Sequence, residues 1–137
     1  MKKIESITIE NFAPYGSVLE FPKDCKEDFF IVETEKNEPW RLAVFRYRNK
    51  DIKTMEMHIT SKESFEPLRG ITVIVVALEE SLDDYKAFVL DKPICLKKGI
   101  WHQVMSLTPE SEVKITENLE VESEYRDLKK SISAYIG

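Results

Sequence analysis

Two histidines and the acidic residues around the first of them are the side chains of this sequence best suited to chemistry. Glu56 lies two residues before His58, Glu63 lies five residues after it, and His102 is the second histidine. An imidazole acts as an acid or a base near neutral pH, and a carboxylate beside it can fix which ring nitrogen carries the proton. The first hypothesis is therefore acid–base catalysis by Glu56, His58 and His102.

The same residues support a second hypothesis, a metal site. Two imidazoles and two carboxylates, from His58, His102, Glu56 and Glu63, are donors that suit divalent Zn, Ni, Mn or Fe. Glu63 belongs to the polar stretch 60–64, which predicts an exposed carboxylate and makes Glu56 the better placed of the two. A third alternative is a small-molecule-binding cavity that has lost its catalytic groups. Separately, either histidine could simply be a hydrogen-bonded core residue.

The elements that must position these residues have the pattern of β-strands. Apolar and polar residues alternate, or apolar residues continue without a break, in seven short segments separated by turn residues. These segments are 40–48, 52–59, 71–78, 85–90, 94–96, 101–107 and 112–116. Glu56 and His58 are two residues apart on one such segment and therefore lie on the same face of it. Many short strands at close spacing predict a mainly β fold, an antiparallel sandwich or barrel.

Helix is expected in only three places. Residues 10–13 and 82–85 could each form a single turn. The tail from Ser123 predicts a C-terminal amphipathic helix, because its apolar residues recur at helical spacing. These residues are Tyr125, Leu128, Ile132 and Tyr135.

Composition and charge limit the class of protein. The chain has 137 residues, 42% of them hydrophobic and 33% charged, which indicates one globular domain over residues 1–137. Lys and Arg total 20 against 25 Asp and Glu, and the net charge of −5 argues against a nucleic-acid partner. The longest apolar run is too short to cross a membrane, and the first residues lack the apolar stretch of an export signal. We therefore expect a cytoplasmic protein with reduced cysteines.

The surroundings of the histidines resemble the two motifs of the cupin superfamily. The first motif is H-x-H, three or four residues, E, six residues and G, and the second is P-x-G-x-x-H-x-x-x-N. This sequence matches them at His58, Glu63, Gly70, Gly99 and His102. Glu56 replaces the first His, and Lys97 and Ser106 replace the Pro and Asn of the second motif. The resemblance implies a cupin-like double-stranded antiparallel β-barrel with few short helices.

A narrower resemblance, to the ureidoglycolate lyases, covers most of the chain. Four segments look like that family's motifs: 9–18 its opening motif, 56–58 its E-R-H, 65–68 its F-x-P-[LM] and 99–103 its [GN]-V-W-H-H. Met57 stands where the family has Arg, Gln103 stands where it has a second His, and residues 95–98 replace its N-Y-H-R.

This resemblance implies an enzyme that cleaves ureidoglycolate, or a related small ureido or hydroxy acid, to glyoxylate and urea. A base must take the hydroxyl proton as the carbonyl forms, and an acid must protonate the departing urea nitrogen. A cation should also hold the substrate carboxylate. The candidates for this cation are Lys97, Lys98, Arg46 and Arg48. A small-molecule substrate is the expected partner, and exposed strand edges predict pairing into a homodimer.

Overall fold

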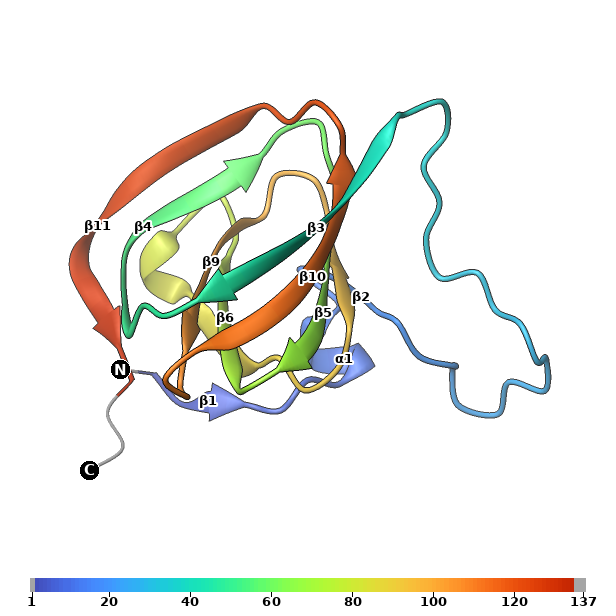
Figure 1. The fold of residues 1–137 in the computed structure, drawn as a ribbon, viewed down its shortest axis with the longest axis horizontal. Helices are drawn as coiled ribbons and strands as arrows, with labels where there is room; N and C mark the ends of the chain where they lie inside the picture. Colours follow the sequence, from blue (N-terminus) through green and yellow to red (C-terminus); the bar gives the residue numbers. More distant parts are fainter. Residues whose placement is uncertain (1, 135–137) are drawn as a thin grey trace.

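Two β-sheets packed face to face form the body of the protein in this computed structural model, which describes residues 2–134 (Figure 1). Sheet A has the strand order β1 (Ile4–Glu5), β7 (Lys86–Val89), β6 (Thr72–Ala77), β9 (Trp101–Ser106), β4 (Asp51–His58) and β11 (Ser123–Ser133). Sheet B has the order β2 (Gly16–Val18), β8 (Ile94–Leu96), β5 (Glu63–Arg69), β10 (Ser111–Asn118) and β3 (Trp40–Tyr47). Neighbouring strands are antiparallel, except that β1 runs parallel to β7.

The central strand β6 shows why the sheets need cover on both sides. All six of its residues are buried, and the five from Val73 to Ala77 are apolar on both faces. Ile74 and Val76 join the apolar core between the two sheets. Val73, Val75 and Ala77 join a second apolar cluster on the outer face of sheet A. The chain therefore has one core inside the sandwich and another behind sheet A.

All seven segments predicted as strands are strands, within two residues of their expected ends. The mainly β class predicted from the sequence is confirmed. Within residues 2–134 no strand of sheet A pairs with a strand of sheet B. The two sheets therefore enclose a space between them without closing into one hydrogen-bonded barrel.

The two predicted single turns of helix are present. Helix α1 (Ile9–Phe12) begins with a capping box, in which Thr8 Oγ1 accepts from the Asn11 amide and Asn11 Oδ1 accepts from the Thr8 amide. The 3-10 helix η1 (Leu82–Asp84) precedes β7. None of the helices in the described part of the chain is long and apolar enough to cross a membrane.

The predicted C-terminal helix is wrong, because residues 123–133 form strand β11 on the edge of sheet A beside β4. Leu128 and Ile132, four residues apart, share a face in a strand as well as in a helix, so their spacing does not separate the two. Both pack on the outer apolar cluster of sheet A. Tyr125, three residues from Leu128, points elsewhere and is exposed, and Tyr135 lies outside the described residues.

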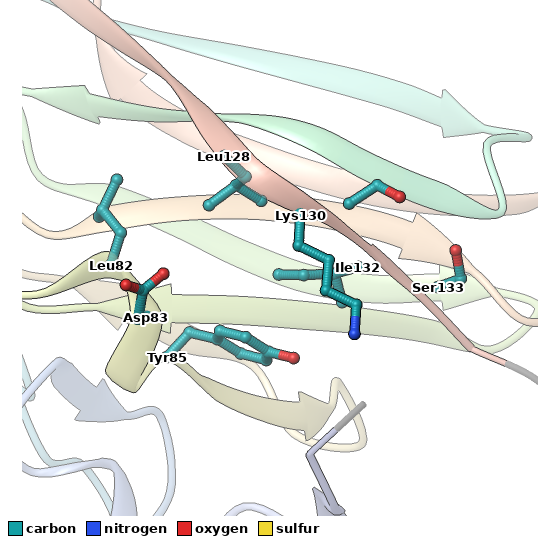
Figure 2. A pocket seen from close by; sticks show the side chains of 8 residues that line it. Leu82, Asp83, Tyr85, Leu128, Lys130, Ile132 and Ser133 are labelled. Carbon is teal, nitrogen blue, oxygen red and sulfur yellow. The ribbon is translucent and has the colours of Figure 1, made fainter.

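A hollow of about 710 Å³ lies between η1 and β11 on the outer side of sheet A (Figure 2). Leu82, Tyr85, Leu128 and Ile132 line it, with Lys130 at its edge. It contains neither histidine, so the chemistry predicted from the sequence belongs elsewhere.

A long segment without helix or strand connects β2 to β3 and stands away from the body of the protein (Figure 1). We call residues 19–39 the arm. Its corners are at Asp24 and Asn37, whose φ angles of 66° and 61° lie in the left-handed region that these two residue types tolerate. Backbone hydrogen bonds hold its two ends, from Leu19 N to Pro93 O and from Leu119 N to Pro39 O.

Candidate active site

The candidate site is a cavity of about 620 Å³ between the two sheets. Strand β4 contributes Glu56 and His58, β5 contributes Glu63, β9 contributes His102 and β10 contributes Glu117. Glu56 is the register partner of His102 in the β4–β9 pairing, which places the two motifs side by side. Strand pairing thus brings together residues that lie up to 61 positions apart in the sequence.

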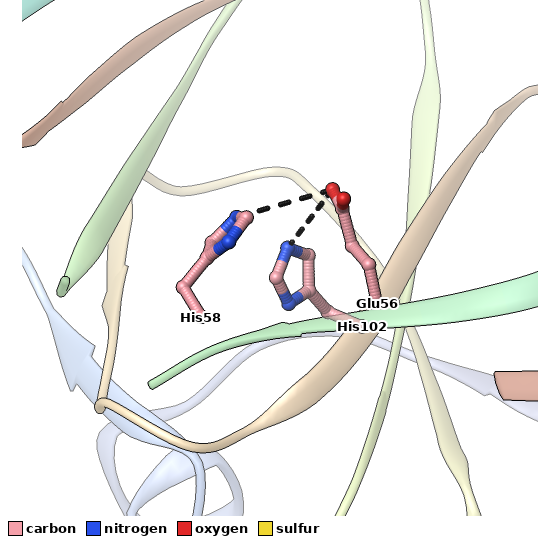
Figure 3. Close-up of side chains that lie close together, drawn as sticks. All are labelled: Glu56, His58 and His102. Atoms are coloured by element: carbon pink, nitrogen blue, oxygen red, sulfur yellow. Dashed lines mark ion pairs between the residues drawn. The ribbon is translucent and has the colours of Figure 1, made fainter. Parts of the chain in front are cut away.

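The two imidazoles converge on one carboxylate oxygen. Glu63 Oε1 lies 3.0 Å from His58 Nε2 and 2.9 Å from His102 Nε2. Glu56 Oε1 lies farther away, 3.9 Å from His58 Nε2 and 3.6 Å from His102 Nε2. Figure 3 shows both rings turned toward the Glu56 carboxylate. All four residues proposed as metal ligands from the sequence therefore meet at one point.

Glu63 is buried, and the expectation of an exposed carboxylate there was wrong. Only 5% of the residue is accessible to solvent. The polar stretch in which it lies continues into strand β5, where Glu63 and Phe65 point into the cavity. Ser64 and Glu66 point to the outside of sheet B, where they line a different hollow. The polarity of the stretch belongs to its outer face and hid the inward position of Glu63.

A contact at Nδ1 fixes the orientation of each imidazole ring. His102 Nδ1 lies 3.0 Å from the carbonyl oxygen of Ile100, which can only accept, so Nδ1 carries a proton. His58 Nδ1 lies 2.9 Å from Ser123 Oγ on strand β11. In both residues Nε2 is thereby directed toward the carboxylates. A ring held through Nδ1 with Nε2 free is the usual arrangement of a metal-binding histidine.

Charge and burial shift the pKa values in opposite directions at this centre. Burial alone raises the pKa of Glu63, but the two imidazoles outweigh it and hold that pKa well below its usual range. Burial alone lowers the pKa of His102, but the carboxylates of Glu56 and Glu63 outweigh it and raise that pKa. These shifts favour the ionised form of Glu63 and the protonated form of His102 at neutral pH.

The donor set fits a divalent cation. Glu63 Oε1 and His102 Nε2 are buried and lie close together, yet they are not aligned for a hydrogen bond and each lacks a partner. Ligand atoms of Glu56, His58 and His102 lie within 4.8 Å of one another, and so do those of His58, Glu63 and Glu117. Imidazole nitrogens together with carboxylate oxygens suit Mn, Fe, Ni and Zn.

Arg41 is the cation that faces this cavity, and sequence reasoning missed it. Its Nε and Nη2 donate to Glu117 Oε2 over 3.1 and 2.7 Å, and Glu117 Oε1 lies 3.9 Å from His58 Nε2. Arg41 and Tyr47 alternate with outward residues along β3, so both reach the cavity. Strand alternation was the available signal, but Arg41 lies far from both histidines in the sequence.

The four cations proposed from the sequence lie outside the cavity. Arg46 is on the outer face of β3, 3.3 Å from Glu112, and Arg48 lies beyond the strand, 3.3 Å from Glu110. Lys98 is 3.0 Å from Glu35 of the arm. Lys97 lines a separate hollow beside α1 and β2. A substrate bound among the histidines would therefore meet Arg41 before any of these four.

Two of the departures from the family motifs, at Met57 and Gln103, occupy different places relative to the cavity. Met57 lies on the opposite face of β4 from Glu56 and His58, in the apolar cluster behind sheet A. Gln103 lines the cavity, and its side-chain amide donates to Thr54 O over 3.3 Å. Only the second departure changes a group that faces the site.

Comparison with known proteins supplies the family. No curated protein matches the chain significantly. Similar solved structures include a dTDP sugar isomerase from Desulfovibrio desulfuricans G20, at TM-score 0.48 and 8% identity, covering 88% of this chain and 82% of that one. Another is oxalate decarboxylase from Bacillus subtilis, a protein with Mn(II) centres. It matches at TM-score 0.47 and 11% identity, covering 70% of this chain and 24% of that one. A third is procruciferin, an 11S globulin from Brassica napus. It matches at TM-score 0.48 and 10% identity, covering 61% of this chain and 22% of that one.

This chain thus spans about a quarter of the length of the decarboxylase and globulin chains. The family model for ureidoglycolate lyase matches residues 26–132, which include every residue of the cavity described above. By that match, the chain belongs to the ureidoglycolate lyase family of enzymes.

Proposed function

We propose that this protein cleaves ureidoglycolate, or a closely related small ureido or hydroxy acid, to glyoxylate and urea in the cavity between the sheets. One observation carries the proposal: in a chain of this family, both histidine Nε2 atoms lie within 3.0 Å of the buried Glu63 oxygen. Glu56 lies beside them, with about a quarter of its side chain exposed to the cavity.

Glu56 is the group placed to move the proton. The pKa of Glu56 is raised by burial but lowered more by His102 and His58, so it is a carboxylate at neutral pH. As a base it takes the substrate hydroxyl proton while the oxygen forms the carbonyl of glyoxylate and the C–N bond breaks. The same proton then passes to the departing urea nitrogen. The reaction needs no further proton, oxidant or reductant.

Arg41 is the group proposed to hold the substrate carboxylate. A guanidinium can bind a carboxylate through two parallel hydrogen bonds, which fixes orientation as well as position. About half of the Arg41 side chain is exposed, against 9% of the side chain of its partner Glu117. Arg41 is thus anchored on one side by Glu117 and open to the cavity on the other.

A divalent metal ion fits this centre, and His58, His102 and Glu63 are the residues proposed to hold it. Three carboxylates, of Glu56, Glu63 and Glu117, face the cavity and oppose the entry of an anionic substrate. When bound, a divalent ion would act as a Lewis acid that polarises a substrate oxygen. His58 and His102 present Nε2 for this purpose because Ser123 and Ile100 occupy Nδ1.

The test is the release of urea and glyoxylate from ureidoglycolate by the purified protein. It is run on chelator-treated protein and on the same protein reloaded with Zn, Ni, Mn or Fe(II). We expect release faster than in buffer, and higher still after reloading with one of these ions. Gln103→His, which restores the family residue in the cavity, should increase the rate, whereas Met57→Arg should only disturb the apolar cluster behind sheet A.

Two outcomes would replace this proposal. Folded protein that binds an ion but releases no urea would be a metal-binding cupin of another activity. Folded protein that neither binds an ion nor releases urea would be a non-catalytic small-molecule-binding cupin.

A further inference from the structure

Tyr47, the last residue of strand β3, places a phenol in the cavity that the proposed reaction does not use. The residue is only 7% exposed, and its ring stacks on that of Phe45 with the centroids 4.2 Å apart. Within residues 2–134 its hydroxyl takes part in no hydrogen bond. Buried polar groups are normally paired, so an unpaired hydroxyl beside a cavity indicates a donor kept free for a ligand.

The other uncharged polar side chains that line the cavity are already engaged. Ser123 Oγ lies 2.9 Å from His58 Nδ1. The side-chain amide of Gln103 donates to Thr54 O over 3.3 Å, and its oxygen accepts from a backbone amide of β9 over 3.1 Å. Among the described residues of the cavity, Tyr47 is therefore the uncharged polar side chain that has no protein partner.

The surroundings of Tyr47 keep its hydroxyl protonated. Burial raises the pKa of the phenol, and the carboxylates of Glu63, Glu56 and Glu117 raise it further. Because all three carboxylates act on it, the phenol lies on the side of the reacting centre. Tyr47 is thus a hydrogen-bond donor throughout the neutral pH range and does not act as a base.

Tyr47 and Arg41 lie at opposite ends of the cavity floor. Both face inward from β3, six positions apart, which in a strand corresponds to about 20 Å between their Cα atoms. Strand register places Arg41 beside Glu117 at its end. The inward residues between the two ends, Ala43 and Phe45, are apolar. The floor therefore offers a cation at one end and a neutral donor at the other.

We propose that the Tyr47 hydroxyl binds the ureido carbonyl oxygen of the substrate and thereby sets a preference for ureido acids. The inference rests on the lyase function proposed above. Ureidoglycolate has an anionic carboxylate at one end and a neutral ureido group at the other, which matches the polarity of the cavity floor. With the carboxylate at Arg41, the ureido oxygen is the acceptor that faces the phenol. A site with a buried donor rejects a molecule that lacks the acceptor, because the donor is then left unpaired.

The same contact assists the cleavage of the C–N bond. As this bond breaks, its electron pair moves onto the departing nitrogen and is shared with the ureido oxygen until the nitrogen is protonated. An O–H donor placed at that oxygen stabilises the negative charge as it develops. The proton of Tyr47 stays on Tyr47, so the reaction still needs only the proton that Glu56 carries.

Product inhibition separates the two ends of the substrate. Urea is tested as an inhibitor of glyoxylate release, and glyoxylate as an inhibitor of urea release, in wild type, Tyr47→Phe and Arg41→Ala. Tyr47→Phe keeps the ring that stacks on Phe45 and removes only the hydroxyl. It should raise the inhibition constant of urea by about 3–10-fold, the value of one neutral hydrogen bond, and leave that of glyoxylate unchanged. Arg41→Ala should do the reverse.

Tyr15→Phe is the matched control for the loss of a buried hydroxyl. Tyr15 is also 7% exposed and belongs to the same core between the sheets, but it does not line the cavity. Its replacement should change neither inhibition constant. Far-UV circular dichroism verifies that each variant is folded.

The outcomes distinguish this inference from the lyase function on which it rests. An active wild type whose inhibition by urea is the same in Tyr47→Phe would overturn the inference and leave the lyase function intact. Equal changes for urea and glyoxylate in Tyr47→Phe would do so as well, because they would show a general disturbance of the cavity. A folded wild type that releases no urea would overturn the lyase function, and the inference with it.

Discussion

At the scale of single residues, the centre depends on which face of a strand each side chain occupies. Arg41 and Arg46 belong to the same strand, five positions apart, and therefore point to opposite sides. Arg41 enters the cavity and pairs with Glu117, while Arg46 pairs with Glu112 on the outer surface. Only the first of these two guanidinium groups can meet a substrate held among the histidines.

Replacing these two arginines tests the proposed carboxylate contact. Arg41→Ala should raise KM for ureidoglycolate by roughly 10–100-fold, since a charge-assisted hydrogen bond is worth about 1.5–3 kcal/mol. Arg46→Ala should leave KM unchanged. Steady-state kinetics of glyoxylate release on both variants make the comparison. If Arg46→Ala raises KM as much as Arg41→Ala does, the substrate carboxylate is not held inside the cavity.

Sequence alone could predict part of this centre. Glu56 and His58 were assigned to one face by their spacing of two, and His102 by its motif, and these three do lie together. The burial of Glu63 was misjudged and Arg41 was not considered, because both positions depend on how β5 and β3 flank β10 in sheet B. That order is set by pairing between distant segments, which local spacing does not encode.

At the scale of elements, two glycine turns lead into strands next to the site. Gly70 joins β5 to β6 with a φ of 74°, and Gly99 precedes β9 with a φ of 82°. A Cβ at Gly70 would lie 2.6 Å from Glu110 O and 2.7 Å from Thr108 Oγ1, whereas a Cβ at Gly99 would meet nothing within 4 Å. The two positions thus share the backbone requirement but differ in the space around them.

Alanine at these positions should separate backbone strain from steric conflict. Gly99→Ala should cost about 1–2 kcal/mol of unfolding free energy, the price of a left-handed conformation for a residue with a Cβ. Gly70→Ala should cost clearly more, roughly 3–4 kcal/mol, because the backbone carbonyl of Glu110 must also move. Urea unfolding of both variants measures the difference. Equal losses would mean that the turn at Gly70 relaxes freely.

Strands with a strong local pattern were easier to predict than polar or very short ones. The seven strands with clear alternation or a continuous apolar run were found, but the polar strand β5 and the two- and three-residue strands β1 and β2 were not. The edge strand β11 was mistaken for a helix because Leu128 and Ile132 fit both periods. Pairing with β4, rather than any local preference, decides its conformation.

At the scale of the whole molecule, the centre places opposite charges in a buried space and so links folding to pH. The pKa of Glu63 is lowered from its ordinary 4.5, so its contribution to stability is complete above pH 4.5 and is lost as the pH falls below it. The pKa of His102 is raised from its ordinary 6.5, so its contribution is complete below pH 6.5 and is lost as the pH rises above it.

In chelator-treated protein, Glu63 and His102 should therefore add most to the free energy of unfolding between about pH 4.5 and 6.5. The measurement is the urea-unfolding free energy as a function of pH, for wild type and for His102→Asn. The wild type should lose stability between pH 6.5 and 9, and His102→Asn should lose much less over the same interval. Parallel curves for the two proteins would show that His102 has no raised pKa.

The central claim is that the carboxylate between the two imidazoles belongs to the reacting centre. The most direct test compares two variants, Glu63→Gln and Glu66→Gln, in the rate at which they release glyoxylate from ureidoglycolate. Glu66 lies on the same strand as Glu63 but faces outward. Glu63→Gln removes the charge that both Nε2 atoms face and that is proposed to help hold the metal ion, so it should lower kcat by about 10–100-fold or more, while Glu66→Gln should match the wild type. An active wild type whose rate survives Glu63→Gln, or falls equally with both substitutions, would contradict the account.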